Sequence, residues 1–178
     1  GGGNGGAITV ASGGNMDFYG SANVQGQSGN GGSISLMAQG SFSGYGTLDA
    51  GGGVNGGSVI VRGTETDPYF PAIGMTGSVD VRGGSGDGGV VDFQGVGGVR
   101  FEGDIYASGG TDGGDIHLHG TDSFYDGGVF VEGTMDASGT NGNGGLIDLY
   151  AIGDVYAIDL FAWGGIDGGD ITITGAAV

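Results

Sequence analysis

The chain has 178 residues, 50 of them Gly, and it carries 20 Asp and Glu against three Arg and no Lys, for a formal charge of −17. This charge repels phosphate backbones and anionic bilayers, so we expect no nucleic-acid partner. The sequence has no Cys, which excludes disulfides and thiolate metal sites. No run of about 18 apolar residues is present, so we expect no membrane-spanning helix.

One seven-residue phrase recurs along the whole sequence: Asn or Asp, Gly, Gly, any residue, apolar, any residue, apolar. It begins at Asn4, Asn30, Asn55, Asp87, Asp112, Asn143 and Asp167. Successive starts are roughly 25 residues apart, and two longer units carry insertions near 64–74 and 121–127. A fixed apolar phase over such a period indicates stacked repeats, so we predict one solenoid domain over 1–178.

Within each unit, alternating apolar positions predict strands with one buried face. We number positions from the Asn or Asp and call them slots. Slots 4 and 6 hold the first apolar pair, as in Ile34 and Leu36, and slots 12, 14, 18 and 20 are again small or apolar. Slot 16 is Gly in most units, as in Gly46 and Gly103, which indicates a sharp bend.

These patterns predict an all-β fold, a right-handed parallel β-helix of about 6.5 coils of roughly 25 residues with three strands per coil. Glycine corners would separate the strands, because Gly accepts positive φ at low cost. Antiparallel hairpins in a sandwich or propeller are the alternative. They would not require the same slot to be apolar in every unit.

Several phrases resemble the repeats of filamentous-haemagglutinin-type exoproteins, among them NGGSISLMA (30–38), TLDAGGGVNGGSVIV (47–61) and DIYASGGTDGGDIHL (104–118). The resemblance implies a secreted right-handed β-helix of the kind found in bacterial adhesins and biofilm-matrix proteins. It also implies an extracellular or cell-surface location. The amino-terminal secretion domain of that family is not visible in this sequence.

Two groups of residues are candidate metal ligands. Stacking would place Asp87 beside Asp112, where two carboxylates repel unless a cation or proton intervenes, so a Ca²⁺ site is one interpretation and a structural corner the other. Stacking would also align Asp92, His117 and Asp148 in one row, which could hold a transition metal or form a surface charge ladder. We expect no cofactor to be required, with Ca²⁺ as the candidate ion. A further outward row, including Asp49, Asp80 and Asp136, predicts an acidic face.

Aromatic residues in the insertions and the sixth unit are candidate contacts for a partner subunit, a glycan or a cell surface. They are Tyr69, Phe70, Phe124, Tyr125 and Trp163. The alternative for the two insertions is that they only fold over Gly97 and Gly98 of the unit between them.

The ends of the chain suggest how it could assemble. It opens one step from a repeat start, without Met, and closes on an apolar segment, so we expect a processed or excised product. Neither end has a predicted cap, and an uncapped solenoid invites head-to-tail addition of further copies. We therefore predict a non-enzymatic structural or adhesive extracellular protein that forms a filament with itself.

Three alternatives stay open. The chain could be an excised repeat segment of a larger surface adhesin. It could be a polysaccharide-acting enzyme, although the three Arg occupy different slots and no carboxylate pair stands out. It could bind ice or a mineral surface, although Thr rows occur only in the terminal units.

Overall fold

The computed structural model describes residues 3–66, 70–121 and 128–176, and every regular element in these ranges is a β-strand. All strand pairs are parallel, and neighbouring partners come from successive repeats. The predicted β-solenoid is therefore confirmed, and the antiparallel alternative is wrong. No long apolar helix that could cross a membrane occurs in the described ranges.

The first sheet contains the strand that follows each Asn/Asp-Gly-Gly phrase. Its strands lie in sequence order: β1 (Ala7–Ser12), β3 (Ser33–Ala38), β5 (Ser58–Gly63), β7 (Val90–Gly95), β9 (Asp115–Gly120), β12 (Leu146–Ala151) and β15 (Asp170–Thr174). The register aligns the first apolar slots of all seven repeats, because Ile8 pairs with Ile34, and Ile147 with Ile171.

The second sheet contains the remaining strands. They are β2 (Met16–Asn23), β4 (Phe42–Asp49), β6 (Ile73–Asp80), β8 (Val99–Tyr106), β10 (Val129–Glu132) and β13 (Val155–Tyr156), with β11 (Thr134–Asp136) between β8 and β14 (Asp159–Phe161). In the first four coils the second and third predicted strands form one continuous strand, and in the next two they are separate. The first insertion ends at residue 72, because Ile73 is already a fully buried strand residue.

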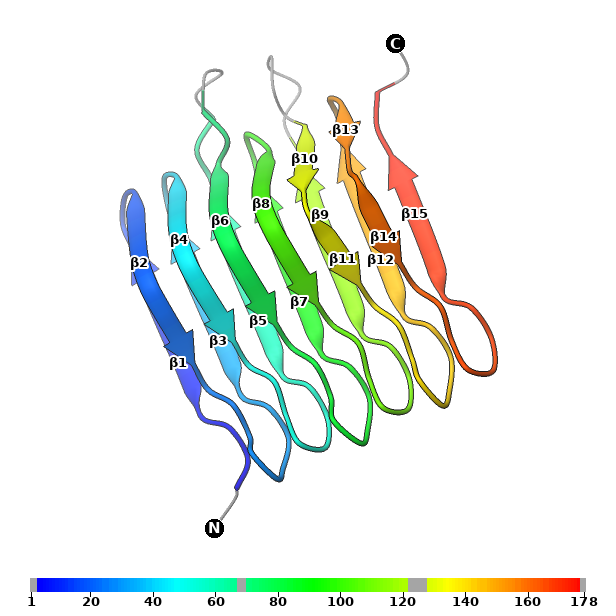
Figure 1. Cartoon of the computed structure of the whole chain (residues 1–178). Helices are drawn as coiled ribbons and strands as arrows, with labels where there is room; N and C mark the ends of the chain where they lie inside the picture. The colour runs from blue at the N-terminus through cyan, green and yellow to red at the C-terminus, as the bar shows by residue number, and fades with distance from the viewer. Residues whose placement is uncertain (1–2, 67–69, 122–127, 177–178) are drawn as a thin grey trace.

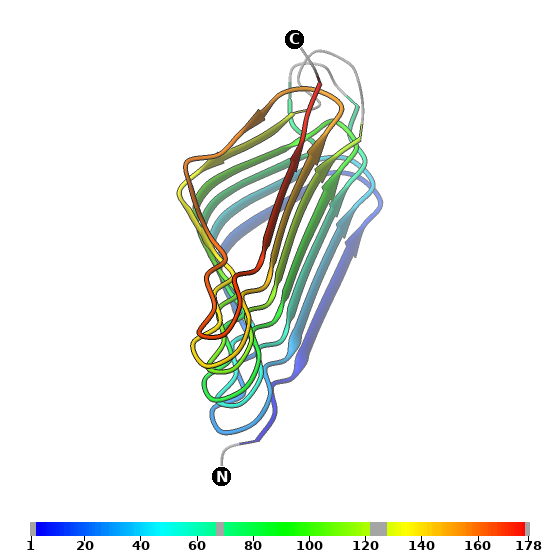
Figure 2. The ribbon, with the colours of Figure 1, turned by 90° about the vertical axis from the view of Figure 1, so that its right-hand side faces the viewer.

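The chain rises along the first sheet and descends along the second while it advances from β1 to β15, so the coil is right-handed (Figure 1). Viewed nearly along the solenoid axis, each coil has the outline of a flattened triangle, and the second sheet bends part of the way along its strands (Figure 2). The N- and C-terminal coils therefore form the two ends of a short prism.

The bend in the second sheet lies at the glycines predicted in slot 16. Gly46, Gly77, Gly103 and Gly133 have φ angles between 137° and 151°, a region that L-residues with a Cβ rarely adopt. A Cβ at Gly103 would also collide with the carbonyl oxygen of Gly77 in the coil below. Glycine is therefore required there by both conformation and stacking.

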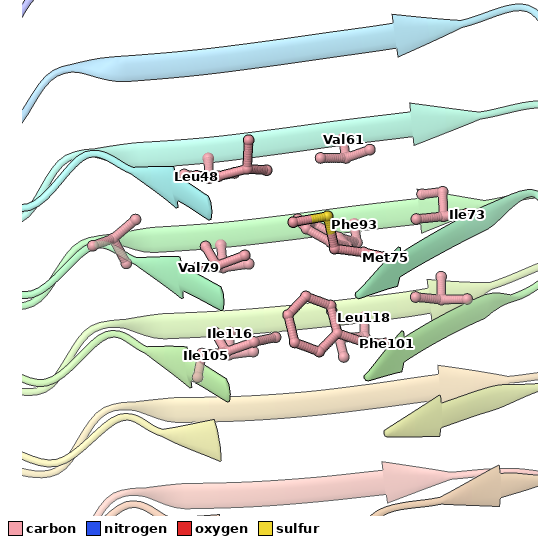
Figure 3. Packing of buried hydrophobic residues seen from close by; sticks show 14 of the residues in the cluster. Leu48, Val61, Ile73, Met75, Val79, Phe93, Phe101, Ile105, Ile116 and Leu118 are labelled. Carbon is pink, nitrogen blue, oxygen red and sulfur yellow. The ribbon is translucent and has the colours of Figure 1, made fainter. Parts of the chain in front are cut away.

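The interior is filled by columns of apolar side chains from both sheets (Figure 3). Phe93 of the first sheet and Phe101 of the second are fully buried and meet edge to face, with ring centroids 5.9 Å apart. Complete burial of such side chains stabilises the fold by about 1.5–3 kcal/mol each relative to exposure. The core is continuous along the axis, as the periodic slots predicted.

Candidate functional site

The outer face of the first sheet carries a cluster of two histidines and one aspartate. His117 and His119 alternate with the buried Ile116 and Leu118 on β9, so both imidazoles point outward. Asp148 lies on β12, directly opposite His117 in the parallel register. The side chains are partly buried, each 27% exposed.

One carboxylate oxygen of Asp148 connects the two histidines of this cluster. Asp148 Oδ2 lies 2.9 Å from His119 Nε2 and 3.7 Å from His117 Nδ1. The two imidazole rings meet edge to face with centroids 5.9 Å apart, and the His119 ring also contacts the ring of Tyr150. One donor atom from each of the three residues lies within 4.8 Å of the others, a spacing that a metal ion could bridge.

The predicted row of Asp92, His117 and Asp148 is present in the backbone register, since His117 pairs with Asp92 on one side and Asp148 on the other. The side chains are arranged differently. Asp92 Oδ2 receives a 2.5 Å hydrogen bond from Arg62, which also donates to the Asp92 carbonyl oxygen. The sequence analysis did not include His119 in this row, but its imidazole is the second one in contact with Asp148. His119 could have been found, because i and i+2 share a strand face.

Asp87 and Asp112 lie one above the other, as predicted, but within a ladder of hydrogen bonds. Asp87 Oδ1 accepts from the backbone N–H of Asp112 at 3.3 Å, and Asp112 Oδ1 accepts from the N–H of Asn143 at 2.7 Å. Asn4, Asn30 and Asn55 make the same bond to the coil that follows. An oxygen acceptor is what these bonds require, which explains why both Asn and Asp occur at this position. The structure thus gives Asp87 and Asp112 a structural role as hydrogen-bond acceptors between coils.

The aspartates of the outward acidic row also have a structural role. Asp49, Asp80 and Asp136 each accept a hydrogen bond from the backbone N–H two residues later, an Asx turn that starts the glycine corner. Asn23 does the same in the first coil. Three of the 20 Asp and Glu residues of the chain therefore have a structural role at turns.

The three arginines of the chain are each paired with carboxylates. Arg62 binds Asp92, Arg82 binds Asp80 through Nε and Nη2, and Arg100 lies 2.7 Å from Glu102 and 3.7 Å from Glu132. The hydrogen bond to Asp80 raises the pKa of Arg82 further above its usual value.

Tyr106 lies beneath one of these arginines. The guanidinium carbon of Arg82 is 5.0 Å from the centroid of its ring, and Tyr106 Oη donates to Asp104 Oδ2 at 3.1 Å. Burial and that hydrogen bond raise the pKa of Tyr106.

The two aromatic candidates that the structure describes, Phe70 and Trp163, lie in different parts of the molecule. Phe70, 65% exposed, belongs to the segment between β5 and β6, whereas Trp163, 56% exposed, follows β14. Figure 1 shows the connection from β5 to β6 at the upper ends of the strands and the segment after β14 leading to the lower loops. Tyr69, Phe124 and Tyr125 lie outside the described residues. A pair that the sequence analysis missed is Tyr19 and Tyr45, one coil apart in the same slot, whose exposed rings stack at 5.4 Å with an angle of 4°.

The last coil exposes the apolar columns that are buried elsewhere. All five residues of β15 are exposed, and its core-slot residues Ile171 and Ile173 are 45% and 54% exposed. The side of β15 opposite β12 has no strand partner among the described residues. The other exposed large hydrophobic residues of the sixth repeat are Tyr150, Ile152, Tyr156, Ile158, Phe161, Trp163 and Ile166.

Comparisons with protein-family models, with curated proteins and with solved structures find no match for this chain. The class that the fold itself defines is a right-handed parallel β-solenoid with a glycine-lined bend and an Asn/Asp ladder at one corner.

Proposed function

We propose that this chain is a non-enzymatic structural protein of the extracellular adhesin type, whose coils stack end to end with those of further copies. The resemblance of its repeats to filamentous-haemagglutinin-type exoproteins supports the extracellular, adhesive part of the proposal. The ion-paired state of all three arginines supports the non-enzymatic part, because an enzyme acting on acidic polysaccharides would need cationic groups for its substrate.

The observation that carries the proposal is the apolar, unpaired edge at β15. No strand among the described residues pairs with its outer side beside Ile171 and Ile173, an arrangement that templates the addition of another strand. In the interior of the solenoid the same columns are completely covered by the coil that follows. The edge of β15 therefore has the chemistry of a coil interface.

The first strand of another copy has a matching pattern. Continuing the observed register places Ile8 of the next copy on Ile171 and Val10 on Ile173. The ladder continues too, because the carboxylate of Asp167 would accept the N–H of Asn4 as each earlier Asn or Asp does. Head-to-tail contact of this kind is heterologous and propagates into a filament.

The joint is narrower than an interior coil interface. The outermost strands of the second sheet, β13 and β14, belong to the repeat before β15, so the end is stepped. Direct strand pairing between copies is thus confined to the first sheet. We expect assembly to depend strongly on protein concentration.

The test is a double substitution at the exposed edge, Ile171→Asp with Ile173→Asp. Sedimentation velocity and negative-stain microscopy over a range of concentrations should show filaments for the unmodified chain and monomers for the variant. Met37→Asp is the matched control, because Met37 is 45% exposed like Ile171 but lies on the outer face of β3. It should leave assembly intact.

A chelator should leave the filaments unchanged, because the Asn/Asp ladder is satisfied by backbone N–H groups. An unmodified chain that stays monomeric at all concentrations would overturn the end-to-end proposal. So would filaments that persist in the double variant.

A further inference from the structure

The cluster on β9 and β12 has the spacing of a metal site. In tetrahedral coordination with bonds of about 2.0–2.2 Å, neighbouring ligand atoms lie about 3.3 Å apart. The Asp148 Oδ2 distances to the two ring nitrogens, 2.9 and 3.7 Å, lie on either side of this value. Small rotations of the side chains would allow one ion to contact all three residues.

The donor set selects the class of ion. Two imidazole nitrogens and one carboxylate oxygen suit first-row transition metals, whereas Ca²⁺ and Mg²⁺ prefer sites made wholly of oxygen. Affinity for such a set generally rises towards Cu²⁺ and is lower for Zn²⁺. Three protein ligands also leave room for water or a donor from another molecule.

The ligands are held on a rigid base. Ile116, Leu118 and Leu149 alternate with them along β9 and β12 and are fully buried. The two strands are in register from Leu146 opposite Asp115 to Ala151 opposite Gly120. A site on such strands is preorganised, since the backbone need not move when the ion binds.

The surroundings favour a cation. Asp92, on the other side of His117, has one buried carboxylate oxygen, Oδ1, without a hydrogen-bond partner. Arg62, which lies in the same column as His119 two coils earlier, is held by the other oxygen of Asp92. The formal charge of −17 adds a general attraction for cations.

We propose that His117, His119 and Asp148 bind one divalent transition-metal ion across strands β9 and β12, with Cu²⁺ bound more tightly than Zn²⁺. The site lies on the outer face of β9 and β12, whereas the proposed end-to-end contact lies at the free edge of β15, the strand that pairs with β12. It ties two adjacent coils together on the outer face of the first sheet.

The sequence makes the test unusually direct, because His117 and His119 are the only histidines and the chain has no Cys. Calorimetric titration of the untagged chain with Cu²⁺ and Zn²⁺ should show one equivalent of each. Cu²⁺ should give electron paramagnetic resonance hyperfine structure from two nitrogens, and Zn²⁺ should shift the resonances of both imidazoles. Ca²⁺ should shift neither.

Substitution identifies the ligands. His117→Gln, His119→Gln and Asp148→Asn should each weaken Zn²⁺ binding by at least about tenfold, and the double histidine variant should bind none at the site. Asp112→Asn is the matched control, a carboxylate removed outside the cluster, and it should bind like the unmodified chain. Circular dichroism establishes that each variant is folded.

Two outcomes would overturn the proposal. One is Zn²⁺ or Cu²⁺ binding that survives removal of both histidines, which would indicate adventitious binding to surface carboxylates. The other is a folded, unmodified chain whose imidazole resonances do not respond to Zn²⁺, a result that no failure of a variant to fold could produce.

Discussion

The middle coils and the last coil contain the same apolar pattern in different surroundings. Leu118 in the fifth coil is fully buried, whereas Ile173, two coils further along the same column, is 54% exposed. The residue type and the slot are equivalent, so neither determines burial. A slot becomes core only when coils cover it on both sides, and equivalent substitutions should therefore have very different costs in the two regions.

The largest difference is expected at the first glycine of the repeated phrase. A Cβ at Gly88 would collide with the backbone carbonyl of Ala107 and the N–H of Gly114, whereas at Gly168 nothing lies within 4 Å. Gly88→Ala should lower the free energy of unfolding by more than about 3 kcal/mol, because the coil would have to separate from its neighbour. Gly168→Ala should change it by less than about 0.5 kcal/mol. Urea denaturation followed by circular dichroism measures both, and equal costs would contradict the comparison.

The next difference concerns the apolar column itself. Leu118→Ala should cost about 2–5 kcal/mol, because it leaves a cavity between covered coils. Ile173→Ala should cost under about 1 kcal/mol, since its side chain is already largely in water. The measurement is urea denaturation at concentrations where the chain is monomeric. A large cost at Ile173 under these conditions would show that the last coil is covered after all.

The Asn/Asp ladder gives a smaller difference. Asp112→Ala removes the acceptor of the Asn143 N–H and should cost about 1–3 kcal/mol, while Asp112→Asn keeps the acceptor and should cost little. Asp167→Ala should be nearly neutral in the monomer, because no backbone N–H of the described residues donates to the Asp167 carboxylate. Thermal unfolding of the three variants measures their loss of stability and should rank them in this way. A cost at Asp112→Asn equal to that at Asp112→Ala would instead assign the effect to the charge.

The smallest effect is expected at Tyr106 of the fourth coil, which lies in the same column as Phe161 of the sixth, since both pair with Asp136. Burial and the hydrogen bond to Asp104 raise the pKa of Tyr106, so between its unfolded and folded pKa values the folded chain binds more protons than the unfolded one. Stability from this group is thus complete below about pH 10 and is lost as the pH rises above it. Tyr106→Phe should flatten the alkaline end of a stability profile measured by denaturation. An unchanged slope would show that Tyr106 does not contribute.

The sequence predicted much of the fold because the fold repeats. The apolar slots and the slot-16 glycines are each defined by several repeats, so one irregular unit does not obscure them. The strand count was less well determined, because whether a chain bends within a strand or between two strands depends on local hydrogen bonding at the bend. In the candidate metal site, the row of Asp92, His117 and Asp148 followed from the period. The side-chain contacts could not be predicted from the period. Asp92 is hydrogen-bonded to Arg62, and His119 is the residue hydrogen-bonded to Asp148.

The sequence by itself determined the stacking: a glycine-rich chain with apolar residues at fixed intervals buries them only if equivalent positions lie above one another. Only the tertiary structure decided what the polar residues do. The carboxylates of Asp87 and Asp112 accept backbone N–H groups, and those of Asp49 and Asp80 form turns. Asp148 instead meets two imidazoles. The physical reason is that burial follows from a one-dimensional pattern, whereas a hydrogen bond depends on which donor lies within about 3 Å in three dimensions.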